Sequence, residues 1–169
     1  PARVIDVLAG SGLFISAVAK CLPNAELHAV EIDPLASIIL RANARVLGFD
    51  TRLTVHTEDY CNVSLARIEA PTLFIGNPPY VRHHGIDKSK KAWYAKTAAK
   101  YGLKASGLAG LHLYFYLKTF ELSQANDFGV FITAAEWMDV NYGQLLRSLL
   151  ADPLGASTIQ LLHPETAVF

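Results

Sequence analysis

Short apolar runs alternate with amphipathic stretches along this chain of 169 residues. We expect strands at 4–8, 26–31, 53–56, 72–75, 128–134 and 158–162. Between them we expect helices at 13–21, 34–47, 108–125 and 139–150. Strands that alternate with helices predict a parallel sheet covered by helices on both faces. Ligands bind beyond the carboxyl ends of such strands, so the residues after each strand are the candidates for function.

Composition predicts one domain without a membrane segment. Hydrophobic residues make up 51% of the chain and charged residues 18%, so a sizeable core is available. The apolar runs are shorter than the roughly 20 residues that span a bilayer, and the first residues read as a strand instead of a signal peptide. Cys21 and Cys61 have no CxxC partner, so we expect two buried, reduced thiols and a cytoplasmic protein.

Small residues follow the first expected strand. Asp6 lies at its end, and the run Ala9-Gly10-Ser11-Gly12 leads into the first helix. Small residues let the backbone approach a ligand closely, and the N-terminus of the helix favours a carboxylate. A tight strand-to-helix turn without a ligand would have the same sequence, so the motif is weak when taken alone.

Acidic residues follow the second and third expected strands. Glu31 lies about 20 residues beyond Gly10, a position suited to accept hydrogen bonds from ribose hydroxyls. Asp59 lies just beyond the third strand and could accept a bond from the amine of an adenine ring. Each could instead be a solvated loop acid, but their order along successive strand ends favours a nucleoside site. The G-x-G-x-x-G spacing of dinucleotide-binding turns is absent, which disfavours a nicotinamide cofactor.

The fourth expected strand leads into Gly76 and then Asn77-Pro78-Pro79-Tyr80. An amine conjugated to a ring is a poor nucleophile, because its lone pair is delocalised. The side-chain oxygen of Asn77 and the carbonyl of Pro78 could accept its two N–H groups and localise that lone pair. Prolines stiffen the turn, and Tyr80 offers a flat face for a planar substrate. A rigid surface turn is the alternative.

These motifs resemble, in content and order, those of adenine-N6 DNA methyltransferases of restriction-modification systems, in which the cofactor motif precedes the catalytic one. The resemblance covers nearly the whole chain and extends to 111–117, 129–137 and 142–147. It implies a doubly wound, mostly parallel α/β sheet, Rossmann-like and incomplete at both ends, and S-adenosylmethionine as cofactor. It implies no metal. The residues that it assigns to catalysis are Asn77, Pro78, Pro79 and Tyr80. Those that it assigns to the cofactor are Asp6, Ala9, Gly10, Gly12, Glu31, Ile32, Asp59 and Asn77.

The chain departs from the family pattern at two places. Val7, Leu8 and Ala9 replace the usual Pro-Ala-Cys of the first motif, which changes local contacts to the cofactor. His112 stands where the family often has an acid before Leu-Tyr, so a cofactor contact from that helix is in doubt. We expect residues 1–169 to be the catalytic domain of a longer protein, with the target-recognition domain outside this sequence.

Charge is unevenly distributed in a chain whose formal net charge is zero. The segment 81–104 holds seven Lys and Arg residues against one acid, with Trp and Tyr interleaved. Basic side chains neutralise phosphates and aromatic ones stack on bases, so the segment predicts contact with DNA. We expect a mobile loop that closes over DNA as a base flips out, although a solvated lysine-rich loop or helix would share the pattern. The candidate DNA-binding residues are Arg82, Lys88, Lys90 and Lys91.

The expected reaction is methyl transfer from S-adenosylmethionine to the N6 amine of adenine in double-stranded DNA, in company with a restriction or specificity subunit or domain. Three alternatives stay open. The same turn serves methyltransferases of protein glutamine amides, and it serves those of adenine in RNA. A third alternative is a module that binds S-adenosylmethionine or DNA without catalysis. His83 and His84 lack partners at ligand spacing, which disfavours a metal site.

Overall fold

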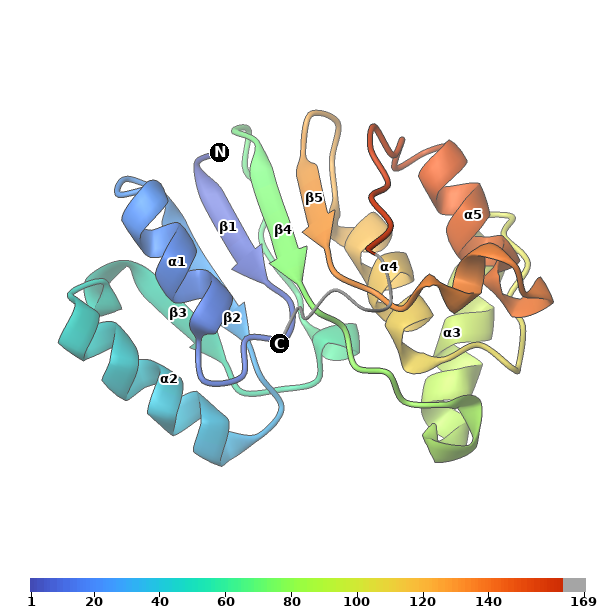
Figure 1. Ribbon diagram of the computed structural model, residues 1–169, viewed down its shortest axis with the longest axis horizontal. Helices are drawn as coiled ribbons and strands as arrows, with labels where there is room; N and C mark the ends of the chain where they lie inside the picture. Colours follow the sequence, from blue (N-terminus) through green and yellow to red (C-terminus); the bar gives the residue numbers. More distant parts are fainter. Residues whose placement is uncertain (163–169) are drawn as a thin grey trace.

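The order of strands in the sheet determines where the candidate site lies. The computed structural model describes residues 1–162, in which one sheet has the order β3-β2-β1-β4-β5 (Figure 1). Its strands are β1 (Arg3–Asp6), β2 (Glu26–Val30), β3 (Leu53–His56), β4 (Thr72–Gly76) and β5 (Phe128–Phe131). All neighbouring pairs are parallel, so the carboxyl ends of the strands meet along one edge of the sheet. The predicted doubly wound parallel fold is confirmed.

Helices cover both faces of the sheet. The helices α1 (Leu13–Cys21) and α2 (Pro34–Leu47) pack on one face, and α4 (Leu111–Leu122) packs on the other. The helices α3 (Lys88–Lys100) and α5 (Gln144–Ala151) pack against α4 in a second apolar cluster. Figure 1 shows α1 and α2 beside β1–β3, whereas α3, α4 and α5 gather at the β4–β5 side. Buried apolar side chains therefore hold the strands between two helical layers.

The ends of α2 follow from local chemistry. The side chain of Asp33 accepts a hydrogen bond from the Leu35 N–H at 2.9 Å, and Pro34 occupies the first helical position. Gly48 ends the helix in the left-handed region, with φ of 75°, which glycine adopts without a steric penalty. The predicted bounds of α2 are confirmed, and they orient the loop that carries Glu31.

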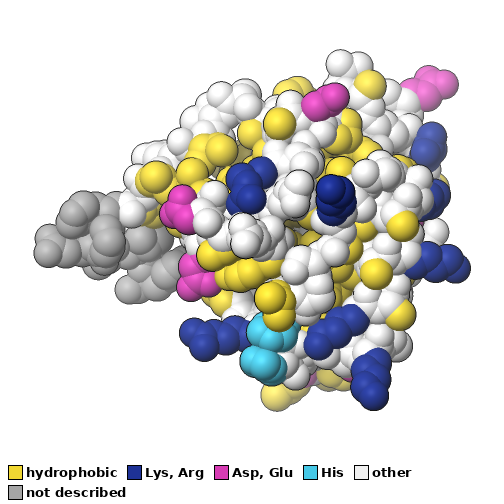
Figure 2. Space-filling view, turned by 90° about the vertical axis from the view of Figure 1, so that its right-hand side faces the viewer, with side chains coloured by type: hydrophobic (Ala, Val, Ile, Leu, Met, Phe, Trp, Pro, Cys, Tyr) yellow, Lys and Arg dark blue, Asp and Glu magenta, His cyan; other side chains and the backbone are white. Residues whose placement is uncertain are grey.

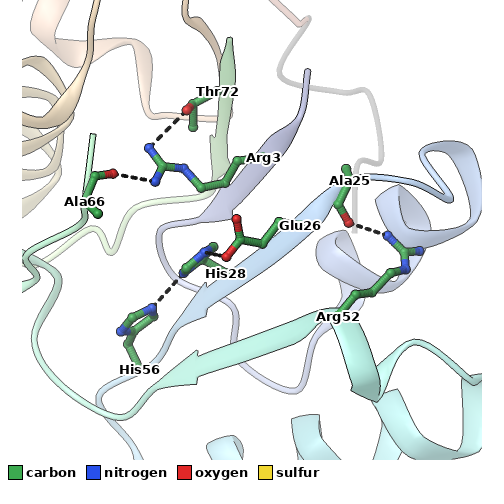
Figure 3. Close-up of polar contacts among 8 residues, drawn as sticks. All are labelled: Arg3, Ala25, Glu26, His28, Arg52, His56, Ala66 and Thr72. Carbon is green, nitrogen blue, oxygen red and sulfur yellow. Dashed lines mark hydrogen bonds and ion pairs between the residues drawn. The ribbon is translucent and has the colours of Figure 1, made fainter. Parts of the chain in front are cut away.

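Two arginines bind backbone carbonyls across the sheet (Figure 3). Arg3 is buried in β1 and donates to the Ala66 carbonyl at 2.7 Å and to the Thr72 hydroxyl at 3.1 Å. Arg52 donates to the carbonyls of Leu22 and Ala25 at 2.9 and 2.8 Å. These contacts tie the loop before β4 to β1, and the loop before β2 to the start of β3.

A chain of imidazoles crosses from β2 to β3. Nδ1 of His28 lies 2.9 Å from Nε2 of His56, and Nε2 of His28 lies 2.9 Å from a carboxylate oxygen of Glu26 (Figure 3). Burial is the largest cause of a lowered pKa at His56, the neighbouring His28 lowers it further, and Glu58 opposes the shift. The carbonyl of His56 accepts the Glu31 N–H at 3.0 Å, so this pair lies next to the candidate site described below.

The last predicted elements are partly wrong. The stretch 158–162 forms no strand, because an apolar run becomes a strand only when another strand pairs with its backbone. The strand predicted at 128–134 ends at Phe131, and it is not buried, since Phe128 and Val130 are 59% and 63% exposed. The exposure of Phe128 and Val130 follows from the position of β5 at the edge of the sheet.

Two predicted helices are shorter than expected. The helix predicted at 108–125 spans Leu111–Leu122. The helix predicted at 139–150 begins only at Gln144, after tight turns at Ala135–Met138 and Asn141–Gly143. A Cβ on Gly143 would lie 1.9 Å from the Trp137 carbonyl oxygen, and Arg147 donates to that same oxygen at 2.6 Å. This close packing holds 135–143 in turns and delays the start of α5.

Two further expectations are corrected. Lys88–Lys100 is a helix and not a loop, and it packs on α4 through Tyr94, Thr97 and Ala98. Cys61 is buried as predicted, whereas Cys21 is exposed at the end of α1. Among residues 1–162 no helix is long and apolar enough to cross a bilayer.

Candidate cofactor and catalytic site at the carboxyl edge of the sheet

The turn after β1 leaves space in front of one glycine and none beside the other. Gly10 and Gly12 both have positive φ, 54° and 96°. A Cβ on Gly12 would lie 2.2 Å from Leu40 of α2, so this glycine lets α1 and α2 pack together. A Cβ on Gly10 would meet nothing within 4 Å. Gly10 is therefore the glycine beside which a ligand has room.

Asp6 is a buried acid with one unpartnered oxygen. Its Oδ1 accepts a weak bond from the Leu8 N–H at 3.4 Å, whereas Oδ2 has no hydrogen-bond partner among the described residues. Burial raises the pKa of Asp6 to about 7, Glu31 adds to the rise, and backbone N–H groups of Leu8 and Ile15 oppose it. A buried oxygen without a donor is costly, so this oxygen suits a donor supplied by a ligand.

Glu31 joins the ends of β1 and β2. One carboxylate oxygen accepts the Gly10 N–H at 2.8 Å, and the other accepts the Asp33 N–H at 2.8 Å. Each oxygen has a second lone pair, so both can still accept a hydroxyl. The next side chain, Ile32, is exposed. An acid fixed by two backbone donors next to an exposed apolar side chain matches a site for a ribose joined to a flat base.

Asp59 lies in the turn that follows β3. Its Oδ1 accepts the Cys61 N–H at 3.0 Å and so caps the short turn Tyr60–Asn62. Its Oδ2 forms an ion pair with the ammonium of Lys90, from the first turn of α3. Sequence spacing could not reveal this contact, because the two residues belong to distant elements.

The turn after β4 holds the predicted catalytic residues close to the glycine turn. β4 pairs with β1, and a Cβ on Gly76 would lie only 2.6 Å from a methyl of Val7. Gly76 therefore allows the two strand ends to approach each other. Pro78 is buried, Asn77 is half-buried, and the Tyr80 hydroxyl donates to the Asn77 side-chain oxygen at 2.6 Å. The aromatic ring of Tyr80 is 52% exposed and so is accessible to a planar substrate.

His112 lies behind this turn. Its ring is buried at the start of α4, and its centroid lies 6.4 Å from that of Tyr80. Neither ring nitrogen has a hydrogen-bond partner among residues 1–162. Burial lowers the pKa of His112, and Glu136 opposes that shift. Proximity of His112 to Tyr80 is a feature of the fold that its sequence position alone does not predict.

Basic residues lie on the outer side of the site. Figure 2 shows Lys and Arg side chains spread over the face at the α3–α5 side, with neighbouring His side chains among them. Arg82, Lys88 and Lys91 make no ion pair with an acid within residues 1–162, whereas Lys90 pairs with Asp59. The rings of His83 and His84 lie 3.8 Å apart, and the described chain has no cluster of three or more metal-ligating side chains.

Two cavities of about 360 and 340 Å³ lie elsewhere, the first between α2 and β3 and the second beside α5. Neither is lined by a predicted site residue. At the predicted site, the ammonium of Lys90 covers Asp59, and the hydroxyl of Tyr80 covers the side-chain oxygen of Asn77. A ligand at this edge would exchange its own donors for those of the protein.

The fold is that of the class I methyltransferases. The methyltransferase subunit of the type I restriction-modification system from Streptococcus thermophilus superimposes with a TM-score of 0.68 at 15% identity, over 88% of this chain and 33% of that one. The chain belongs to the Eco57I restriction-modification methylase family, whose model matches residues 72–167.

Curated relatives match in sequence, among them two methyltransferases. Type II methyltransferase M.XamI of Xanthomonas campestris pv. amaranthicola is 54% identical over 169 residues, which are 100% of this chain and 32% of that protein. The tRNA1(Val) (adenine(37)-N6)-methyltransferase of Porphyromonas gingivalis is 30% identical over 95 residues, 53% of this chain and 37% of that protein. The chain thus spans about a third of the length of these relatives.

Proposed function

We propose that this protein transfers a methyl group from S-adenosylmethionine to the N6 amine of an adenine flipped out of double-stranded DNA. The observation that carries the proposal is the position of Asn77 and Pro78. They follow β4, the neighbour of β1, so the stiff turn stands beside the glycine turn and the acids Asp6 and Glu31. A methyl donor and an amine acceptor would meet between these two turns.

The residues present fit S-adenosylmethionine. Oδ2 of Asp6 has no partner among the described residues and could accept from an ammonium group, and Glu31 could accept from ribose hydroxyls. Asp59 could accept from the adenine amine if the ammonium of Lys90 moves away from Oδ2. Gly10 leaves room for the donor, and Ile32 offers an apolar surface for its base. When bound, S-adenosylmethionine supplies a methyl group on a positively charged sulfur. Ala9 and Gly12 shape the turn that holds these groups in place.

The turn after β4 prepares the nucleophile. The Asn77 side-chain oxygen and the Pro78 carbonyl accept the two amine hydrogens, which localises the nitrogen lone pair toward the methyl carbon. S-adenosylmethionine would supply its methyl group to this nitrogen and leave as S-adenosylhomocysteine, and the nitrogen would release to solvent a proton that methylation has made acidic. No general base is needed before the attack. Pro78 and Pro79 keep the acceptors in place, and Tyr80 stacks on the base.

DNA is the substrate that membership of a restriction-modification methylase family favours. Arg82, Lys88, Lys90 and Lys91 are proposed to bind its phosphates, and the contacts made by these residues repay part of the cost of flipping a base. We propose further that residues 1–169 are a methyltransferase domain, that recognition of the DNA sequence belongs to another domain, and that a restriction or specificity subunit or domain acts with it. A cytoplasmic location fits this role.

The test follows a labelled methyl group. The protein is incubated with S-adenosylmethionine that carries a labelled methyl, together with duplex DNA, RNA or a glutamine-containing protein extract. We expect label on N6 of adenine in DNA, and none after Asn77→Ala. Label in RNA or on glutamine would establish one of the alternative substrates. Binding without transfer would indicate a module that is not catalytic.

Cofactor binding is tested separately by calorimetry. Glu31→Ala should weaken binding of S-adenosylmethionine by about tenfold or more, since it removes acceptors for charged or hydroxyl donors. Glu26→Ala is a matched control, because Glu26 starts the same strand at the opposite edge of the sheet. Equal affinity of Glu31→Ala and the unsubstituted protein would exclude the proposed cofactor site.

A further inference from the structure

Lys90 points inward although it belongs to the basic segment. Its ammonium pairs with the carboxylate of Asp59, and the two side chains are only 20% and 16% exposed. Its backbone N–H donates to the helix-capping Asp87 at 2.8 Å, which fixes Lys90 in the first turn of α3. Lys90 thus links Asp59, which is proposed to hold the adenine of the cofactor, to the start of α3, which is proposed to bind DNA.

Asp59 has little capacity for both partners at once. Oδ1 already accepts the Cys61 N–H, and the ammonium of Lys90 covers Oδ2. Each oxygen has a second lone pair, but the side chain of Asp59 is only 16% exposed, so an adenine amine that reaches Oδ2 competes with the ammonium for the same small opening. A displaced ammonium that stayed largely buried without a counter-charge would be costly, so it needs another anion. The phosphates of DNA are anions that the proposed function brings to the start of α3.

We propose that Lys90 couples cofactor binding to DNA binding. The adenine amine displaces the ammonium from Asp59, and the released lysine binds a DNA phosphate. This inference rests on the proposed function, and it makes Lys90 a positioning residue and not a catalytic one. Because the two binding equilibria are linked, the cofactor raises the affinity for DNA by the same factor by which DNA raises the affinity for the cofactor.

The experiment measures DNA affinity with and without a bound nucleoside. Fluorescence anisotropy of a labelled duplex is recorded in the absence and in saturating presence of S-adenosylhomocysteine, which has the same adenosine but no methyl to transfer. We expect S-adenosylhomocysteine to tighten DNA binding of the unsubstituted protein by about fivefold or more, the lower end of typical couplings. Lys90→Met should bind S-adenosylhomocysteine more tightly in the absence of DNA and should lose the coupling. Lys90→Arg, which keeps the charge, should retain it.

A matched control separates coupling from simple loss of charge. Lys88→Met removes the same charge from the same helical turn, but Lys88 is exposed and makes no ion pair within residues 1–162. It should weaken DNA binding equally with and without S-adenosylhomocysteine. An unchanged coupling factor in Lys90→Met would overturn the inference.

Asp59→Asn gives a second, independent readout. The substitution should weaken the binding of S-adenosylhomocysteine. In the absence of S-adenosylhomocysteine it should strengthen the binding of DNA, because Lys90 is released. Glu58→Gln is the control, because it makes the same change of charge one residue away. Its gain in DNA affinity should be smaller than that of Asp59→Asn. Weaker binding of both ligands by Asp59→Asn would indicate a purely structural role and sink the inference. If the unsubstituted protein binds neither ligand, the proposed function itself fails; if it binds both independently, only the coupling fails.

Discussion

The Tyr80 hydroxyl donates a hydrogen bond to the side-chain oxygen of Asn77, with 2.6 Å between the two oxygens. Under the proposed function, the residue that stacks on the base also holds the acceptor of its amine in position. An arriving amine can replace the hydroxyl as the donor. The exchange keeps the Asn77 oxygen satisfied in both arrangements, so little reorganisation is needed.

Two substitutions at Tyr80 separate the ring from the hydroxyl. Tyr80→Phe keeps the aromatic face, so we expect kcat/KM for methyl transfer to stay within about tenfold of the unsubstituted enzyme, the value of one hydrogen bond. Tyr80→Ala removes the stacking surface, which is worth about 1–3 kcal/mol per base, and should lower kcat/KM by about 5- to 150-fold. Steady-state kinetics with a DNA substrate check both. Equal damage by the two changes would show that the hydroxyl, and not stacking, matters.

Alanine at the two turn glycines should separate folding from binding. Gly12→Ala forces a Cβ into Leu40 at a left-handed backbone position, so we expect a loss of about 2 kcal/mol or more in the free energy of unfolding. Gly10→Ala meets no neighbour, and only its left-handed backbone costs energy, about 1 kcal/mol. Its main effect should be weaker binding of S-adenosylmethionine. Urea unfolding and calorimetry measure the two quantities, and the opposite ranking would contradict the assignment.

Asp6 should make the folded protein less stable as pH rises. Its pKa is about 7 when folded against 3.8 as the ordinary value, so the folded state holds a proton that the unfolded state has lost. Between these two pH values, the titration of Asp6 lowers the free energy of unfolding by about 1.4 kcal/mol for each unit by which pH rises. Asp6→Asn cannot ionise, and it should be more stable than the unsubstituted protein at pH 8. Urea unfolding at pH 5 and pH 8 checks this, and parallel pH dependence of both proteins would refute it.

The titration of His56 should make the folded protein less stable as pH falls, the opposite of the effect of Asp6. Burial and the neighbouring His28 lower its pKa below the ordinary 6.5, so the folded state resists a proton that the unfolded state takes up. Stability from this group is complete above about pH 6.5 and is lost as pH falls below it. His56→Gln should remove that acid sensitivity. Unfolding at pH 5.5 and pH 7.5 tests it, with Asp6→Asn as the background that removes the opposing titration.

Local chemistry explains which parts of the fold could be predicted. Asp33, Pro34 and Gly48 give the bounds of α2, because caps act through neighbours a few residues away. The stretch 158–162 has the composition of a strand but forms none, since pairing depends on backbone elsewhere in the chain. The order of the motifs along the sequence also predicted that Glu31, Asp59 and Asn77 follow strands whose carboxyl ends share one edge of the sheet. Their roles as binding and catalytic residues stay predictions.

Long-range contacts of flexible side chains escaped prediction. The pattern of lysines in 81–104 indicated a basic surface, but nothing in it shows that Lys90 turns inward to Asp59. The hydrogen bond between Tyr80 and Asn77 and the position of His112 behind Tyr80 depend equally on tertiary packing. Periodicity reports which face of an element is apolar, and it carries no information about where a long polar side chain ends.

The central place of β1 has a consequence for how the chain assembles during synthesis. Arg3 lies opposite Thr72 in the register, so the second edge of β1 finds its partner only after the whole of β2, α2 and β3 has been made. Such distant pairing slows folding, because loop closure precedes any gain from contact. A nascent chain that stalls before Gly76 would leave the backbone N–H and C=O groups along this edge of β1 unpaired, and it should depend on chaperones until β4 emerges from the ribosome.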